Sequence, residues 1–263
     1  MLLSAGDIIR ESVGVYRTHA KRLLAYATVV GLPYAILSMG ASMLGLFEKG
    51  MNIGTALGLM IGGLVVMIIA IWGTAGLTRA IATIRNGGTA PTVGVGLQEV
   101  KHLIWPIILV SIITALGVLA GFLLFIIPGI IFSVWYAFGT YAVIIDNHGA
   151  GEAMTTSKKL VAGRWWSVVW RLLAPALVFG LLSFLISLVV TLPASFLLVA
   201  ITPGSVTQIF AVGLMSLLEM LLTILIVPLS TAAPTILYLD LKKTPLPIGP
   251  PLPPSNLSTT PHV

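Results

Sequence analysis

Long stretches without a single charged residue dominate this sequence and limit what it can fold into. They cover residues 23–47, 50–78, 103–145 and 172–218, and a further stretch, 220–239, follows the acid Glu219. A bilayer core about 30 Å thick needs roughly 20 helical residues per crossing. Inside the bilayer the backbone must pair its own hydrogen-bonding groups, and a helix does so. The sequence therefore predicts an all-α, polytopic membrane helix bundle.

Two of the uncharged regions are long enough for more than one crossing and need internal turns. Residues 103–145 contain the sequence Ile-Pro-Gly at 127–129, which predicts a turn because proline lacks an amide proton and glycine accepts positive φ. The last region has turn-forming residues near Thr191 and Pro193 and again at 202–205. We expect the chain to break at each of these places.

These breaks give six transmembrane helices over residues 1–243. Residues 244–263 are rich in proline and are expected to form a disordered cytoplasmic tail with polyproline II character. An even number of crossings places both termini on one side, and every Lys and Arg except Lys49 falls on that side. The positive-inside rule then predicts that both termini are cytoplasmic.

An aromatic cluster marks one membrane boundary. Trp165, Trp166 and Trp170 precede the fifth crossing, where they fit the belt of aromatic residues found at membrane surfaces. Arg171 lies just inside the same helix, and its long side chain can extend back to the lipid headgroups.

Composition limits the classes of function. Hydrophobic residues make up 57% of the chain and charged residues 8%, so the six crossings leave no room for a soluble catalytic domain. The net charge of +6 is spread over the cytoplasmic segments without a nucleic-acid-binding motif, and no nucleic-acid partner is expected. The chain has no cysteine, and its four histidines lack metal-ligand spacing. We expect no metal, no cofactor and no enzymatic activity.

The segments before the first, third and fifth crossings are amphipathic. In the first of them, Ile9, Val13 and Tyr16 are spaced 4 and 3 residues apart, which places them on one face of a helix. This pattern predicts cytoplasmic interfacial helices, each followed by a transmembrane hairpin, and hence a threefold repeat of helical hairpins. The alternative is that any cytoplasmic loop close to a membrane has this pattern.

Several short motifs resemble a known group of proteins. They are FIIPGIIF at 125–132, VIIDNHG at 143–149, SKKLV at 157–161 and GRWW at 163–166, together with GDIIRE at 6–11. In combination they resemble an uncharacterised family of six-helix bacterial membrane proteins, related to the membrane domain fused to some glycerophosphodiester phosphodiesterases. The resemblance implies a multi-pass protein of the bacterial plasma (inner) membrane. The phosphodiesterase barrel is absent, so that activity is not implied.

Glu219 is an acid with apolar sequence on both sides, and intramembrane acids are often functional. Ser216 and Thr223 share its helix face, which predicts a polar face that a proton or cation relay could use. Counting back from Asp240 instead places Glu219 about 31 Å away at ~1.5 Å per residue, near the outer headgroups. Three interpretations follow: an interfacial carboxylate, a buried structural carboxylate and a transport residue.

A second polar cluster lies in the loop between the fourth and fifth crossings. It contains Asp146 and Glu152, with Arg164 on the basic side of the same loop. One interpretation is a binding site for lipid headgroups or a partner. The other is that Asp146 and Asn147 cap a helix end and that Glu152 lies in the first turn of the next helix, where the helix dipole favours an acid.

The sequence favours a non-enzymatic accessory or organising component of the bacterial envelope, which acts through contacts with lipid and with other helices. Its expected partners are the lipid bilayer and other membrane proteins, and the oligomeric state is left open. The alternative is a transporter of a small solute or lipid. A cavity that reaches the polar face of the last helix would favour transport, whereas a closed apolar bundle would favour the accessory role.

Overall fold

A computed structural model describes residues 2–43, 52–199 and 205–244, and all regular secondary structure in these ranges is helical. Six helical segments are long and apolar enough to cross a membrane, which confirms the predicted all-α membrane class. The tail from 245 on, Lys49 and most of the break expected at 202–205 lie outside the described residues.

The elements, in chain order, are α1 (Ala5–Met43), α2 (Ile53–Arg85), α3 (Val93–Val100) with the 3-10 turn Lys101–Leu103, α4 (Ile104–Leu124), α5 (Ile126–Trp135), α6 (Gly139–Asp146), α7 (Ala150–Val161), α8 (Trp165–Val199) and α9 (Val206–Lys243).

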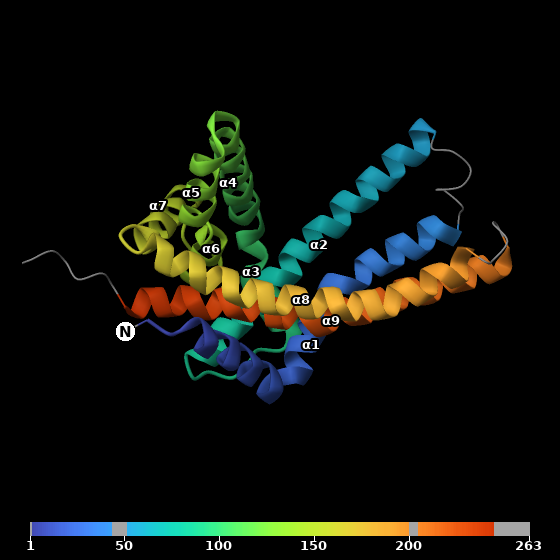
Figure 1. Ribbon diagram of the computed structural model, residues 1–263, viewed down its shortest axis with the longest axis horizontal. Helices are drawn as coiled ribbons and strands as arrows, with labels where there is room; N and C mark the ends of the chain where they lie inside the picture. Colours follow the sequence, from blue (N-terminus) through green and yellow to red (C-terminus); the bar gives the residue numbers. More distant parts are fainter. Residues whose placement is uncertain (1, 44–51, 200–204, 245–263) are drawn as a thin grey trace, which may run out of the picture.

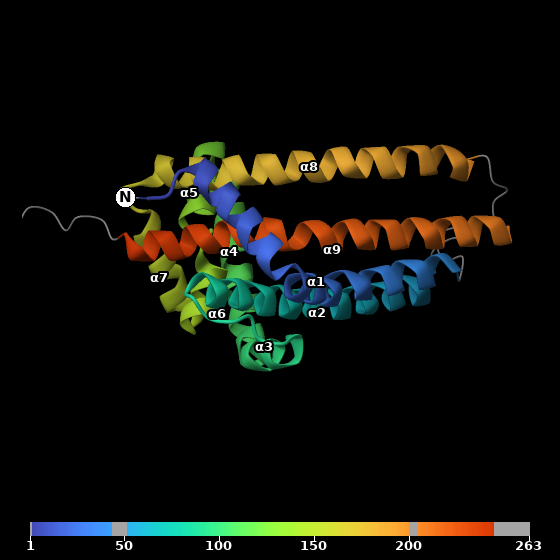
Figure 2. The same cartoon turned by 90° about the horizontal axis from the view of Figure 1, so that it is seen from below.

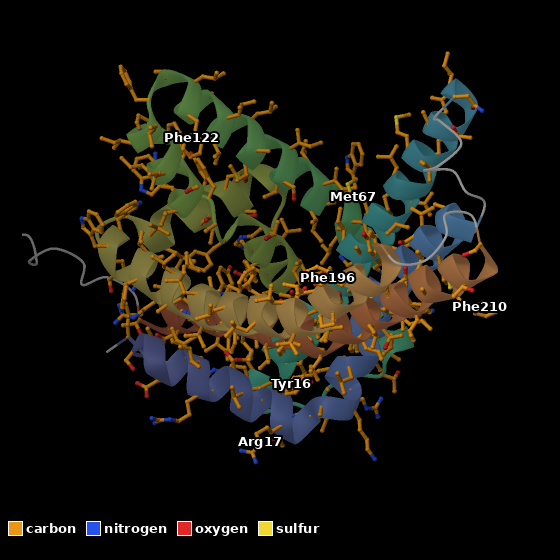
Figure 3. The ribbon with its side chains drawn as sticks, turned by 45° about the vertical axis from the view of Figure 1, so that its right-hand side comes forward. Tyr16, Arg17, Met67, Phe122, Phe196 and Phe210 are labelled. Atoms are coloured by element: carbon orange, nitrogen blue, oxygen red, sulfur yellow. The ribbon has the colours of Figure 1, made fainter. Side chains whose placement is uncertain are left out.

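The long helices pair and then diverge into arms (Figure 1). The second half of α1 packs along α2 and α9, and α8 lies beside α9 along the longest axis of the molecule (Figure 2). The α4–α5 hairpin leaves in a different direction. Phe122 on this hairpin and Met67 on α2 therefore lie on separate arms (Figure 3), and their side chains are 46% and 48% exposed. Exposed apolar side chains along the arms fit a lipid environment.

The core lies where the arms meet. Its two clusters are apolar, and one of them joins α1, α2 and α9 through fully buried side chains such as Tyr26, Leu77 and Ile236. Both described chain ends are at this end of the molecule, because the Leu3 amide donates to Asp240 Oδ2 over 2.9 Å. The arrangement fits the prediction that the termini share one side.

Residues 5–18 form the helix that the amphipathic pattern predicts before the first crossing. A kink at His19, with φ −119° and ψ 23°, separates it from the apolar part of α1. Ile8 and Ser12 on this helix are fully buried, and Arg17 extends away from the other helices (Figure 3). One face therefore packs on the bundle. Helices α3 and α7 likewise precede the α4–α5 and α8–α9 pairs, and the threefold repeat and the contact of these helices with the membrane surface stay predictions.

The turn of the α4–α5 hairpin lies at Phe125, two residues before the predicted turn at 127–129. The break is Phe125, whose backbone is extended at φ −164° and ψ 158°. Pro128 instead lies in the first turn of α5, where an absent amide proton costs no helical hydrogen bond. The expected break at Thr191 and Pro193 is also wrong, because α8 continues through both residues to Val199.

The fourth crossing contains a break that the sequence analysis did not predict. Helix α5 ends at Trp135 and α6 begins at Gly139. The Ser157 hydroxyl of α7 donates to the Trp135 carbonyl over 2.7 Å and accepts from the Phe138 amide over 3.1 Å. The side chain thus pairs the backbone groups that the break leaves open, which makes an irregular segment tolerable inside a membrane protein.

The sidedness of the termini leads to a labelling prediction. Because the chain has no native cysteine, single substitutions Thr89→Cys and Gly151→Cys should react with a membrane-impermeant maleimide only in opened cells. Phe125→Cys, at the exposed tip of the hairpin, should react in intact cells. Labelling of position 151 from outside intact cells would contradict six crossings with cytoplasmic termini.

Candidate functional site

The position of Glu219 follows from the antiparallel packing of α1 and α9. A Cβ built on Gly31 would lie 3.6 Å from Met220 and 3.7 Å from Thr223, and Ser38 Oγ lies 3.5 Å from Ser216 Oγ. Glu219 is therefore level with residues 31–38 of α1, at the centre of the uncharged stretch 23–47 rather than at its outer end.

The count from Asp240 assumes that α9 enters the membrane at Asp240. The contact between Asp240 and Leu3 places this end of α9 beside the start of the chain, well before the apolar part of α1 begins. The last turns of α9 thus run through the packed core at the end of the bundle. The outer-headgroup position was predicted from length alone, without this register, and it stays one of three interpretations of Glu219.

A cavity of about 330 Å³ lies in front of Glu219. Helix α1 contributes Tyr34, α8 contributes Ser183 and Ser187, and α9 contributes Glu219 and Thr223. Glu219 is exposed to this space. Leu222, Ile226 and Val227 complete the wall. An acid and four hydroxyl-bearing side chains therefore converge in the middle of three apolar helices.

The residues of the predicted polar face of α9 do not all lie in the cavity. Thr223 lies in the cavity with Glu219, although its hydroxyl donates to the main-chain oxygen of Glu219 over 2.9 Å rather than to the carboxylate. Ser216 is 6% exposed and faces Ser38 of α1, so it is not part of the cavity. The face thus supplies two of its three predicted residues to one site.

The cavity has the chemistry to hold a proton or a small cation. Among the residues that the structure describes, none forms a salt bridge with Glu219. Carboxylate and hydroxyl oxygens are the ligands that hard cations prefer. The described part of the chain contains no group of three or more His, Cys, Asp or Glu residues that could hold a metal ion.

Asp146 connects two helices. Its carboxylate accepts from the Tyr238 hydroxyl over 2.6 Å and from Lys242 Nζ over 2.7 Å, which ties the end of α6 to α9. Asn147 follows in the left-handed conformation, with φ 57°, and ends the helix. Arg79 of α2 donates to Asn147 Oδ1 over 3.1 Å. The cluster therefore caps a helix, as one of the two interpretations predicted, and also cross-links the core.

Glu152 and Arg164 do not join Asp146 in a single site. Glu152 lies in the first turn of α7, 65% exposed, with its carboxylate 3.4 Å from His148 Nε2. Arg164 donates to the carbonyls of Leu241 and Thr244 over 3.0 and 2.6 Å. These bonds pair open carbonyls at the C-terminal end of α9. Burial lowers the pKa of Arg164, and the nearby Asp240 carboxylate acts in the opposite direction. Through these contacts Arg164 holds the start of α8 against the C-terminal end of α9.

The sequence analysis missed Tyr34, Ser183 and Ser187 as partners of Glu219. The two serines are four residues apart in an uncharged stretch, a spacing that places both on one face of a helix. That spacing was a usable signal. Which α9 residue they face depends on the register of two helices, and no sequence pattern gives that register.

Comparisons with protein-family models, with curated proteins and with solved structures find no match for this chain. The resemblance to six-helix bacterial membrane proteins therefore stays a prediction that rests on the motifs quoted above.

Proposed function

We propose that this integral membrane protein transports a small solute or a lipid, and that the cavity around Glu219 is its binding site. The observation that supports this role is an acid with no ion-pair partner among the described residues, in a hydroxyl-lined cavity level with the centre of an apolar helix. An acid at the centre of a membrane helix costs roughly 2.5–3.5 kcal/mol. A structural role would offset that cost with a fixed partner, and the described residues offer Glu219 no ion pair.

The transported species would neutralise Glu219 when it binds. A proton, a small cation or the cationic group of a larger molecule has the required charge, and the hydroxyl groups of Ser183, Ser187 and Thr223 supply further oxygen ligands. Release restores the unpaired acid, which favours binding of the next ion. The proposed role is non-enzymatic, because binding and release of a charged solute at Glu219 require no bond to be made or broken in the solute.

An accessory role in the bacterial plasma membrane is the second candidate. Its support is the α4–α5 hairpin, which diverges from the other arms (Figure 1) and carries large exposed apolar side chains, among them Leu116, Leu123 and Phe125. Such an arm can pack against another membrane protein or against lipid. Identification by mass spectrometry of the proteins and lipids that copurify from native membranes tests this role, and a stoichiometric partner protein that is lost when Leu116 and Leu123 become Ala would favour it.

Water access to the cavity separates the two candidates. A thiol reacts as the thiolate, which forms in water and not in hydrocarbon. In the cysteine-free chain, Ser187→Cys should therefore react with a water-soluble methanethiosulfonate reagent, because position 187 lines the cavity. Leu188→Cys is the matched control on the next residue of α8. Leu188 is 40% exposed on the apolar surface and should stay unreactive.

The expected result is labelling of position 187 at several times the rate of position 188. Equal and negligible rates at both positions would mean that the cavity is dry, and transport through it would then be excluded. Protection of position 187 by a candidate solute would identify the transported species.

A further inference from the structure

A second cavity lies between α8 and α9, beside the site of Glu219 but with different chemistry. Its volume is about 520 Å³, and it shares Ser183 and Ile226 with the first cavity. Arg171 lies at one end. The walls are mainly apolar, and several residues along them are small or lack an amide proton: Pro175, Ala176, Gly180, Ala233 and Pro234. Because these side chains are short, they leave part of the space between α8 and α9 unfilled at this level, which gives room for a guest.

Arg171 is a cation without an acidic partner among the described residues. Its Nε donates to the Leu3 carbonyl over 2.6 Å, and its Nη1 donates to the carbonyl and the hydroxyl of Ser167. All of these acceptors are neutral oxygens. The described salt bridges do not include Arg171. One of its terminal nitrogens, Nη2, has no acceptor in the described structure, although guanidinium groups favour anionic oxygens.

The neighbouring tryptophans indicate the depth at which Arg171 lies in the membrane. Trp166 and Trp170 are 79% and 60% exposed on the first turns of α8, where aromatic side chains lie at the headgroups. From Arg171 to Ser183 the helix rises about 18 Å at ~1.5 Å per residue. This is close to the thickness of one leaflet of a bilayer core about 30 Å thick. The cavity thus has a cation at headgroup level and an apolar channel about one acyl chain long.

We infer that the cavity between α8 and α9 binds an anionic phospholipid, with its phosphate on Arg171 and one acyl chain along Ala176, Gly180 and Ser183. Charge selects an anionic headgroup, and the apolar walls select an acyl chain rather than a free phosphate. The bound lipid also fills the space between two helices whose side chains leave it open. This inference does not depend on transport through the Glu219 site.

Native mass spectrometry of the detergent-solubilised full chain tests the inference, with phosphatidylglycerol as the anionic probe and phosphatidylcholine as the zwitterionic one. Wild-type protein should retain phosphatidylglycerol preferentially. Arg171→Gln should lower its apparent affinity about tenfold or more, the size expected for a lost charge-assisted hydrogen bond. Ala176→Phe should lower retention to a similar degree while it leaves Arg171 intact, because the added ring fills the chain channel.

Arg10→Gln is the matched control, because Arg10 is a basic residue near the same end of the bundle with an 86% exposed side chain outside the cavity. It should leave retention unchanged. Arg171→Lys keeps the charge and should retain an intermediate affinity, and an unchanged thermal unfolding midpoint of Arg171→Gln would show that its loss of lipid is not loss of folding. Equal retention of the two lipids, equal loss in the Arg10 and Arg171 variants, or full retention in Ala176→Phe would each overturn the inference. None of these outcomes bears on the labelling of Ser187.

Discussion

Replacing Gly121 by leucine is expected to force α4 and α5 apart and to lower the free energy of unfolding by about 1–3 kcal/mol, the usual cost of overpacking. A Cβ at position 121 would lie 2.8 Å from the Cα and 2.9 Å from the amide nitrogen of Gly129. These are backbone atoms, which cannot rotate away as a side chain does. The helices must therefore separate, and the contact between small residues that holds a membrane hairpin together is lost.

Gly117→Leu is the matched control for this prediction. Gly117 is one turn earlier on the same helix, and a Cβ built there meets no atom within 4 Å. Both substitutions add the same apolar side chain to α4, so differences in hydrophobicity and helix propensity cancel. Thermal unfolding of the two purified variants, followed by circular dichroism, should show a lower midpoint for Gly121→Leu alone. Equal midpoints would mean that the hairpin is not packed through these two glycines.

The class of this protein could be predicted from its sequence because the membrane imposes strict conditions. A helix that crosses a bilayer must be about 20 residues long and almost free of charge, and the uncharged stretches meet these conditions without any knowledge of packing. The end of α6 at Asn147 was equally accessible, because a residue that adopts positive φ ends a helix wherever it is packed.

Breaks inside the helices were harder to predict, because one residue type is compatible with more than one position in a helix or turn. Proline is disfavoured inside a helix but accepted in its first turn, so Pro128 was compatible with a turn or with the start of α5. Pro193 lies inside α8, and transmembrane helices tolerate proline where other groups can pair the backbone carbonyl that it leaves open. The break before Gly139 is fixed by Ser157, a residue on a different helix.

In the candidate site, too, some residues can be identified from sequence patterns, whereas others are brought together only by the packing of helices. Glu219 could be identified from its apolar flanks, and Thr223 from helical spacing. The remaining partners, Tyr34, Ser183 and Ser187, depend on how α1 and α8 are aligned with α9. The alignment of α1 with α9 is set by the packing of Gly31 and by the Leu3 contact at the opposite end. These are contacts between residues far apart in the chain, and single-sequence patterns do not contain them.

Glu219→Gln is expected to abolish proton- or cation-driven flux and, at the same time, to stabilise the folded protein. The variant keeps the shape of the side chain but removes the charge that binds the transported cation. It also removes part of the roughly 2.5–3.5 kcal/mol that an acid costs at the centre of a membrane helix. Because the carboxylate is exposed to the cavity rather than enclosed by protein, we expect a gain of about 1–2 kcal/mol, less than the full cost.

The measurement uses proteoliposomes with an enclosed pH-sensitive dye and imposed proton or sodium gradients, together with thermal unfolding of the same preparations. Glu219→Asp keeps the charge and should retain part of the flux. Glu152→Gln is the control, because Glu152 is an exposed acid outside the cavity, and it should change neither flux nor stability. Flux that persists in Glu219→Gln at the wild-type rate would exclude Glu219 as the transport residue.

The stability of Glu219→Gln distinguishes all three interpretations of this acid, even before a transported species is known. A carboxylate at the outer headgroups is already hydrated, so the amide would leave the unfolding midpoint unchanged. A buried structural carboxylate is held by charged or polar partners, so the amide would lower the midpoint. An acid that is retained for transport is kept for function and not for folding. Its replacement by the amide should therefore stabilise the protein and raise the unfolding midpoint. The unpaired carboxylate in the hydroxyl-lined cavity leads us to expect a raised midpoint, and a lowered one would return Glu219 to a structural role.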